Sequence, residues 1–204
     1  MKKVLITLAA LALSGTAMAG PSWTYVDLGY VTGDSGDETT DGLALRGSFG
    51  FGDLWHIQAD VVGSEANGGK GTTGGSDNFG YVLRGGIHPA VTDNTDFVLD
   101  VAYSATEVDD GSGGSTPEPN SIDLRTGVRS NIGQLELRSF VTLAFGDTDL
   151  GGGATDFRSV NYTVGGQYNF NDAWSVGTDA TVGNSSASNG GTGDLLNLYV
   201  RWSF

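Results

Sequence analysis

The chain contains no cysteine, only four prolines, and only ten lysines and arginines among its 204 residues. The missing cysteines exclude a disulfide framework, so packing and hydrogen bonding alone must hold the fold. The few basic residues stand against 24 acidic ones, and the formal net charge is −14. Because such a chain lacks the basic surface that attracts phosphate backbones, we do not expect it to bind nucleic acid.

Long apolar runs are also scarce. After residue 19 no segment approaches the roughly 18 consecutive apolar residues that indicate a membrane helix. At the start, lysines precede an apolar run from Val4 to Leu13, and Ala17-Met18-Ala19 supplies the small residues of a cleavage site. This pattern predicts a secretory signal peptide over residues 1–19 and a single domain over residues 20–204. If that domain enters a membrane, it must do so as a closed barrel, which leaves no backbone group unpaired in lipid.

Glycine, in contrast, is abundant, with 34 residues. Most of it lies in clusters with Ser, Asp and Asn, and the residues between these clusters alternate between apolar and polar types. A period of two is typical of strands with one apolar face. Ten segments of this kind are expected to be strands: Trp23–Thr32, Gly42–Phe51, Trp55–Val62, Phe79–His88, Asp96–Ser104, Ser121–Ser130, Leu135–Phe145, Phe157–Phe170, Trp174–Val182 and Leu195–Phe204.

The connections between these segments alternate in length. Short turns such as Gly52-Asp53-Leu54 alternate with long polar loops such as residues 63–78. Outer-membrane barrels have short periplasmic turns, long extracellular loops and an even number of strands. The sequence therefore predicts an all-β protein, a closed antiparallel transmembrane β-barrel of ten strands, with eight strands as the alternative. Both termini would then lie in the periplasm. A soluble sandwich also has short alternating strands, but it offers no natural place for a balanced set of inward charges.

The chain resembles the small outer-membrane barrels of the OmpA/OmpX-like superfamily. The resemblance is carried by the cleavage site at Ala17-Met18-Ala19, by the hairpin pattern, and by the final YVRWSF at residues 199–204. It implies that Tyr199, Trp202 and Phe204 form a signal for the barrel-insertion machinery. It also implies contact with outer-membrane lipid and lipopolysaccharide. The chain differs from the eight-stranded members of the superfamily by one additional hairpin.

The polar faces of the predicted strands carry charges of both signs. We expect six acidic residues and six arginines to point into the barrel: Asp27, Asp60, Asp100, Asp123, Glu136, Asp179, Arg46, Arg84, Arg125, Arg129, Arg138 and Arg201. Cross-strand spacing predicts three pairs, Arg46 with Asp60, Arg84 with Asp100, and Arg129 with Glu136. A fourth pair, Asp27 with Arg201, would join the first and last strands. These charges could fill the lumen by polar packing or line a narrow path for ions or solutes.

Aromatic residues gather at the predicted periplasmic ends of the strands. Amphipathic rings favour the headgroup zone of a bilayer, so an aromatic girdle is predicted there. Its members are Trp23, Phe51, Trp55, Phe97, Phe170, Trp174, Trp202 and Phe204.

Neither histidine lies in a recognisable catalytic motif. His56 and His88 both fall near the periplasmic ends of neighbouring strands, and no Ser or acidic partner stands at a diagnostic spacing. We therefore expect no catalytic residues, no cofactor and no defined metal site. The acidic loops offer a weaker possibility, because carboxylates at Asp109, Asp110, Asp147 and Asp149 are hard oxygen ligands that divalent cations prefer. Such cations would bridge the loops to lipopolysaccharide phosphates, although the spacing matches no full calcium-loop template.

The predicted function is a structural or surface-interaction role in the outer membrane, exerted through acidic, Gly-rich extracellular loops. A narrow porin-like channel is the alternative, and a barrel enzyme is a minor one.

Overall fold

The computed structural model describes residues 21–35, 38–67, 76–109, 118–149, 154–185 and 194–204. The predicted signal peptide lies outside these ranges. Every regular element within them is a β-strand. In the described part of the chain, no helix is long and apolar enough to cross a membrane. The strands are β1 (Tyr25–Ser35), β2 (Glu38–Phe51), β3 (Trp55–Asn67), β4 (Ser76–Ile87), β5 (Ala90–Thr92), β6 (Thr95–Asp109), β7 (Glu118–Ile132), β8 (Leu135–Asp149), β9 (Ala154–Asn169), β10 (Trp174–Ser185) and β11 (Asp194–Ser203).

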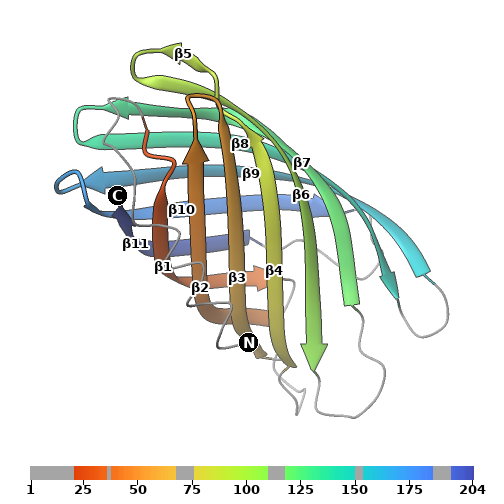
Figure 1. Ribbon diagram of the computed structural model, residues 1–204. Helices are drawn as coiled ribbons and strands as arrows, with labels where there is room; N and C mark the ends of the chain where they lie inside the picture. Colours follow the sequence, from red (N-terminus) through yellow and green to blue (C-terminus); the bar gives the residue numbers. More distant parts are fainter. Residues whose placement is uncertain (1–20, 36–37, 68–75, 110–117, 150–153, 186–193) are drawn as a thin grey trace.

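Ten of these strands close into an antiparallel barrel, as predicted. Each long strand pairs with its neighbours in sequence, and β1 pairs with β11 to close the barrel, with Tyr25 opposite Ser203. The short strand β5 pairs only with β6, so the sheet continues past it through the β4–β6 pairing. Figure 1 shows the long strands wrapping around one axis, with the short turns gathered at one end, called here the short-turn end.

The strands extend further than the sequence pattern predicts. The β1–β2 ladder continues to Ser35 opposite Glu38, and the β8–β9 ladder to Asp149 opposite Ala154, through segments expected to be polar loops. Antiparallel backbone pairing does not require apolar side chains, so a ladder can continue past the apolar part of a strand. The predicted loops, which were inferred from polar composition, therefore begin before the strands end.

Two glycines make the tight turns at the short-turn end. Gly52 follows β2 with a φ of +61°, and Gly133 follows β7 with a φ of +63°. Residues with a Cβ rarely adopt this left-handed conformation, so glycine is the residue that allows each strand to reverse directly. Only Gly133 and Gln134 separate β7 from β8.

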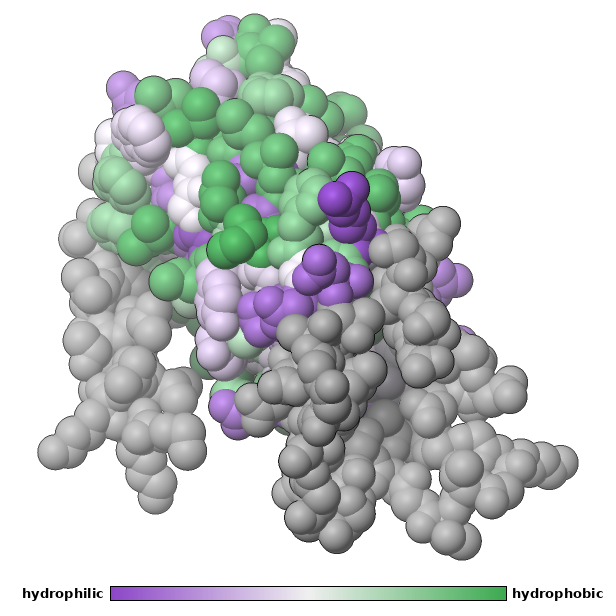
Figure 2. Space-filling view, turned by 90° about the vertical axis from the view of Figure 1, so that its right-hand side faces the viewer, coloured by the Kyte–Doolittle hydropathy of each residue, from purple (hydrophilic) through white to green (hydrophobic). Residues whose placement is uncertain are grey.

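The barrel has its polar residues inside and its apolar residues outside. Leu28, Leu43 and Leu83 on the exterior are 61%, 63% and 62% exposed, whereas the interior Asp27 and Arg201 are 2% and 0% exposed. Figure 2 shows the apolar side chains covering a continuous part of the surface. Soluble monomers rarely expose apolar patches beyond a few hundred Å². A closed barrel with an apolar exterior is the form that integral outer-membrane proteins take.

Candidate functional site

The short-turn end of the lumen is filled by a cluster of rings. Trp23 stacks on both His56 and His88, with ring centroids 4.2 and 4.3 Å away, the two imidazole centroids lie 5.5 Å apart, and all three side chains are buried. The Trp23 Nε1 donates a hydrogen bond of 2.8 Å to Asp96, and the Arg129 guanidinium carbon lies 4.3 Å from the indole centroid. We call these rings, with Asp96 and Arg129, the ring plug.

The ring plug corrects the predicted place of Trp23. This side chain was expected in the lipid-facing girdle, but it is buried inside the barrel. The reason is visible in the parity of the strand, because Trp23 shares the inward parity of Tyr25 and Asp27. Its position at the end of a strand concealed that direction.

Both histidines were expected to be rim residues without acidic partners. Each has an aspartate nearby. His56 Nε2 lies 2.9 Å from Asp100 Oδ1, and His88 Nδ1 lies 3.8 Å from Asp96 Oδ2. His88 follows the end of β4, and burial together with the nearby His56 lowers the pKa of its imidazole below the ordinary value. The acidic partners come from β6, so their distance in sequence hid them from motif analysis.

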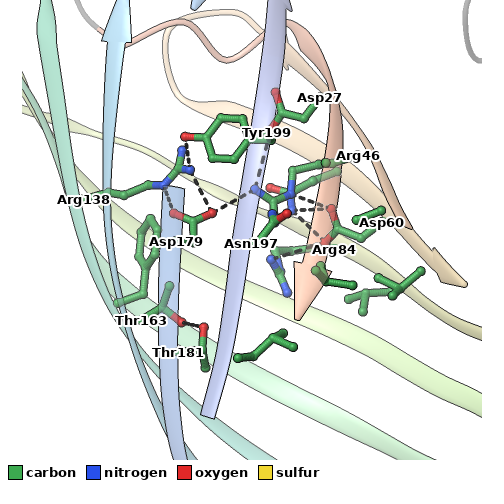
Figure 3. A pocket seen from close by; sticks show the side chains of 18 of the residues that line it. Asp27, Arg46, Asp60, Arg84, Arg138, Thr163, Asp179, Thr181, Asn197 and Tyr199 are labelled. Carbon is green, nitrogen blue, oxygen red and sulfur yellow. Dashed lines mark hydrogen bonds and ion pairs between the residues drawn. The ribbon is translucent and has the colours of Figure 1, made fainter. Parts of the chain in front are cut away.

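A second layer of the lumen consists of paired charges. Arg201 binds Asp27 through two bonds of 2.7 and 2.8 Å, and Arg138 binds Asp179 through two bonds of the same lengths. Two-bond arginine–carboxylate pairs are among the strongest polar contacts in proteins. Figure 3 shows Arg138 pointing toward Asp179, with Asp27 nearby.

Arg46 links the two sides of the lumen. Its Nε lies 2.8 Å from Asp60 on the neighbouring strand, and its Nη1 lies 3.6 Å from Asp27 and 3.5 Å from Asp179. Since Asp179 lies on β10 and Arg46 on β2, this contact crosses the barrel instead of following the sheet. The lumen at this level is therefore spanned by side chains.

The predicted pair Arg129 with Glu136 forms, but between diagonal positions and not between directly opposite ones. The sequence placed these residues directly opposite each other, but the turn falls one residue later and sets Arg129 opposite Arg138. The Arg129 Nε and Nη2 still reach Glu136 at 3.0 and 2.9 Å along the diagonal. Glu136 thus lies between two arginines and offsets their repulsion, since its Oε1 is 3.7 Å from Arg138 Nη1.

The predicted pair Arg84 with Asp100 does not form. The β4–β6 register places Arg84 opposite Ala102 and Asp100 opposite Gly86, two residues away. Asp100 instead binds Arg125, its direct neighbour on β7, and contacts His56. Ala90 of β5 pairs with Asp96 in the same register in which β4 pairs with β6, so the chain reverses one residue later than the count from the predicted turn assumed.

The remaining interior residues make local contacts. Asp123 accepts a hydrogen bond of 2.6 Å from Ser121. Tyr199, assigned by sequence to the insertion signal, is buried in the lumen, where Arg138 donates to its hydroxyl and that hydroxyl donates to Gln167. The ring of Tyr25 lies 3.4 Å from the Arg201 guanidinium carbon. Tyr25 and Gln167 have the inward parity but carry no charge, so they were not among the predicted lumen charges. Asp96 was also left out of that set, as the first residue of its predicted strand.

The other predicted girdle residues lie on the exterior. Those exposed to the surroundings are Phe51, Trp55, Phe97, Phe170, Trp174 and Trp202, and Phe204 is partly exposed. Trp202 lies 6.4 Å from Trp174 and 4.8 Å from Phe204, between ring centroids.

A cavity of about 230 Å³ lies in the lumen beyond the ring plug. Trp23 lines it at the plug, Asp27 and Arg138 line it in the layer of paired charges, and Thr163 and Thr181 lie on the far side of Arg138 (Figure 3). These two threonine hydroxyls are 2.8 Å apart (Figure 3). The cavity is therefore a polar and apolar pocket closed on one side by the plug.

The acidic segments expected to bind cations are only partly described. Asp110 lies outside the described residues, whereas Asp147 accepts a hydrogen bond of 2.9 Å from Asn120. The backbones of Asp109 and Asp149 lie in β6 and β8. Within the described ranges, no group of three or more His, Cys, Asp or Glu side chains is arranged to hold a metal ion.

Neither a protein-family model nor a curated protein matches the chain. Similar solved structures include the KdgM porin, at 12% identity and a TM-score of 0.43, covering 88% of this chain and 99% of that one. LpxR from Salmonella typhimurium has 12% identity and a TM-score of 0.47, covering 88% and 100%. The outer membrane channel DcaP of Acinetobacter baumannii has 15% identity and a TM-score of 0.39, covering 92% and 60%. The resemblance to the OmpA/OmpX-like superfamily stays a prediction.

One of these neighbours corrects a further expectation. LpxR is an enzyme, so barrels of this general class can carry catalysis. The prediction that this chain is not an enzyme was therefore wrong in excluding that class of function. It relied on the absence of one histidine motif, and a fold of this kind does not decide function by itself.

Proposed function

We propose that this chain is an outer-membrane barrel whose lumen is closed, and that it acts in envelope structure or surface contact through its acidic segments. The observation that carries the proposal is the filled lumen. The ring plug occupies the short-turn end, and Arg46 and Arg138 bind Asp179 across the next level. A passing ion would have to displace these arginines from the carboxylates that hold them across the lumen.

Planar-bilayer recording of the refolded barrel tests closure. We expect a flat current trace across a range of voltages. Discrete conductance steps from the wild-type protein would contradict the proposal. A parallel sample with a known porin controls for insertion into the bilayer.

A narrow channel is the second candidate, favoured by the cavity of about 230 Å³. Its lining contains five arginines and three aspartates, which are Arg46, Arg84, Arg125, Arg129, Arg138, Asp27, Asp60 and Asp179. A path through this cavity would favour anions over cations. Anion-selective steps that disappear in an Arg138→Gln variant would support this candidate.

Surface contact is proposed through lipopolysaccharide and divalent cations. Carboxylates near Asp147 and Asp149 would share Ca²⁺ or Mg²⁺ with lipid phosphates. Binding of purified lipopolysaccharide to the barrel in detergent should then fall when the cations are chelated. It should fall further in a variant with both aspartates changed to asparagine. Lipopolysaccharide binding that is unchanged by chelation of the cations would contradict this role.

The proposed orientation places the short turns and both termini in the periplasm. The chain has no cysteine, so single cysteines can report which side of the membrane they face. A membrane-impermeant maleimide applied to intact cells should label Asp194→Cys, at the far end of β11, and spare Gln134→Cys, in a short turn. The reverse result would invert the assigned orientation.

A further inference from the structure

Arg84 differs from the other five lumen arginines. Each of the others has a carboxylate at hydrogen-bond distance: Arg46 on Asp60, Arg125 on Asp100, Arg129 on Glu136, Arg138 on Asp179 and Arg201 on Asp27. The nearest carboxylate oxygen to Arg84 is on Asp60, 4.0 Å from its Nη1. Among the described residues, its buried Nε has no hydrogen-bond partner. The Arg84 side chain is nevertheless only 10% exposed.

The two nearby carboxylates are already engaged by other groups. Asp60 accepts from Arg46 at 2.8 Å and from Gln58 at 3.0 and 2.8 Å. Asp100 binds Arg125 and lies 2.9 Å from His56. A buried guanidinium with an unused donor carries a large desolvation cost unless an anion or a polar group meets it. Arg84 therefore has donor capacity left over.

The Arg84 side chain lines the lumen cavity, as does that of Arg125. Arg84 lies opposite Ala102 in the β4–β6 register, and Arg125 lies opposite Asp100 in the β6–β7 register. The lining carries five arginines and three aspartates, an excess of positive charge inside a chain of net charge −14. In Figure 3, Arg84 lies beside the other labelled charges at the edge of the pocket. Arg125 and Arg129 are offset by Asp100 and Glu136 just behind the lining, so among the described residues Arg84 is the lining arginine that lacks a carboxylate at hydrogen-bond distance.

The walls of the cavity are less polar than its charged floor. On the side of β1 to β4 it is lined by Val31, Ala44, Val62 and Val82. On the side of β8 to β10 it is lined by threonines at 142, 163 and 181. Thr163 and Thr181 use their hydroxyls on each other, so they offer mainly methyl groups to a guest. A ligand here would meet positive charge at one end and apolar surface along its body.

We propose that this cavity binds a small organic carboxylate with a short apolar tail. The carboxylate accepts two hydrogen bonds from the Arg84 guanidinium, which has the planar fork that matches carboxylate geometry. The tail lies along Val62 and Val82 on the neighbouring strands. The cavity exceeds the roughly 150 Å³ that holds one benzene molecule, which leaves room for roughly nine non-hydrogen atoms by the same proportion. Hexanoate has this size and chemistry.

Calorimetry of the refolded barrel in lipid nanodiscs tests the site with hexanoate as the probe. We expect one hexanoate per barrel after subtraction of the heat from protein-free nanodiscs. Hexan-1-ol has the same tail without the charge, and inorganic phosphate has charge without the tail. Both should bind at least roughly tenfold more weakly, since each lacks one half of the recognition. Equal binding of hexan-1-ol would mean partition into lipid or an apolar void, and equal binding of phosphate would mean a simple anion site. Either result overturns the proposal.

Variants separate the two halves of the site. Arg84→Gln should weaken hexanoate binding by roughly tenfold or more, because it removes the charge that meets the carboxylate. Arg158→Gln makes the same charge change at an exposed position and should leave binding unchanged. Val82→Phe keeps Arg84 but fills the cavity, and should abolish binding. Wild-type affinity in either interior variant would overturn the assignment.

Folding must be verified separately, because Arg84 is buried. The barrel content of each variant is followed by circular dichroism and by its electrophoretic mobility before and after heating. Arg84→Lys retains a cation and serves where Arg84→Gln fails to fold. Because an ammonium group lacks the planar fork of a guanidinium, hexanoate should bind this variant with intermediate affinity. If Arg84→Lys binds hexanoate as tightly as the wild type does, Arg84 does not hold the carboxylate through two hydrogen bonds. The site is independent of conductance, so its failure would leave the closed-barrel proposal standing.

Discussion

Arg201 and Asp27 join the last strand to the first through two hydrogen bonds, Nε to Oδ1 at 2.7 Å and Nη2 to Oδ2 at 2.8 Å. They stand directly opposite each other in the β1–β11 register, and both side chains are buried. The guanidinium also covers the ring of Tyr25. The seam that closes the barrel is thus held by backbone pairing and by a buried ion pair.

Changing Arg201 to Ala should destabilise the barrel by about 3–5 kcal/mol, because Asp27 would be left buried without its partner. Urea unfolding in detergent, followed by tryptophan fluorescence, measures this loss. Arg158→Ala removes an exposed arginine and is the matched control. The double variant Arg201→Ala with Asp27→Asn should recover part of the loss. Equal stability of Arg201→Ala and wild type would show that the seam does not depend on the pair.

His88 should make the stability of the barrel depend on pH. Burial lowers the pKa of its imidazole, with a smaller contribution from His56, so the folded state takes up a proton less readily than the unfolded chain. Stability is therefore fully present above the ordinary histidine pKa of about 6.5 and falls as pH drops below it. Unfolding measured between neutral and mildly acidic pH should show this decline, and His88→Gln should reduce it. A profile that stays unchanged in His88→Gln would assign the decline to other groups.

Two glycines, on β10 and on β2, should respond differently to an added methyl group. A Cβ at Gly177 would meet the ring and hydroxyl of Tyr199 and lie 2.8 Å from the Gly166 carbonyl oxygen. A Cβ at Gly47 has nothing within 4 Å. Gly177→Ala should therefore cost about 1–3 kcal/mol from overpacking, whereas Gly47→Ala should stay close to wild type. The same unfolding assay compares them, and equal stabilities would mean that Tyr199 moves aside freely.

Strand parity made most of the fold predictable from the sequence. A barrel must place alternate residues inside and outside, so apolar and charged positions identify the two faces of each strand. This is why Asp27 and Arg201 could be placed together before any coordinates, and why the exterior position of Trp174 follows from its pattern. Parity assigns a residue to a face, but it does not set how far along the barrel that residue lies.

The wrong predictions concern how far along the barrel a residue lies. Arg84 misses Asp100 because the chain reverses between β5 and β6 one residue later than expected. Arg129 faces Arg138 because the turn begins one residue later than expected. Both depend on turn geometry, which a shift of a single residue alters, and a single sequence shows such shifts poorly. The ring plug was missed because Trp23 precedes β1, His88 follows β4, and the other members come from β3, β6 and β7.

Trp23 should be the residue that seals the lumen at the short-turn end. It lines the cavity and stacks on both histidines, so replacing it by Ala removes the surface that separates the cavity from that end. We expect Trp23→Ala to produce discrete conductance steps in a planar bilayer where wild type produces none. Trp174→Ala removes an exterior indole and should remain silent. Loss of a buried Trp typically costs about 3–5 kcal/mol, so barrel content is verified before recording. A flat trace from a folded Trp23→Ala barrel would show that Arg46, Arg138 and Asp179 close the lumen without the ring plug.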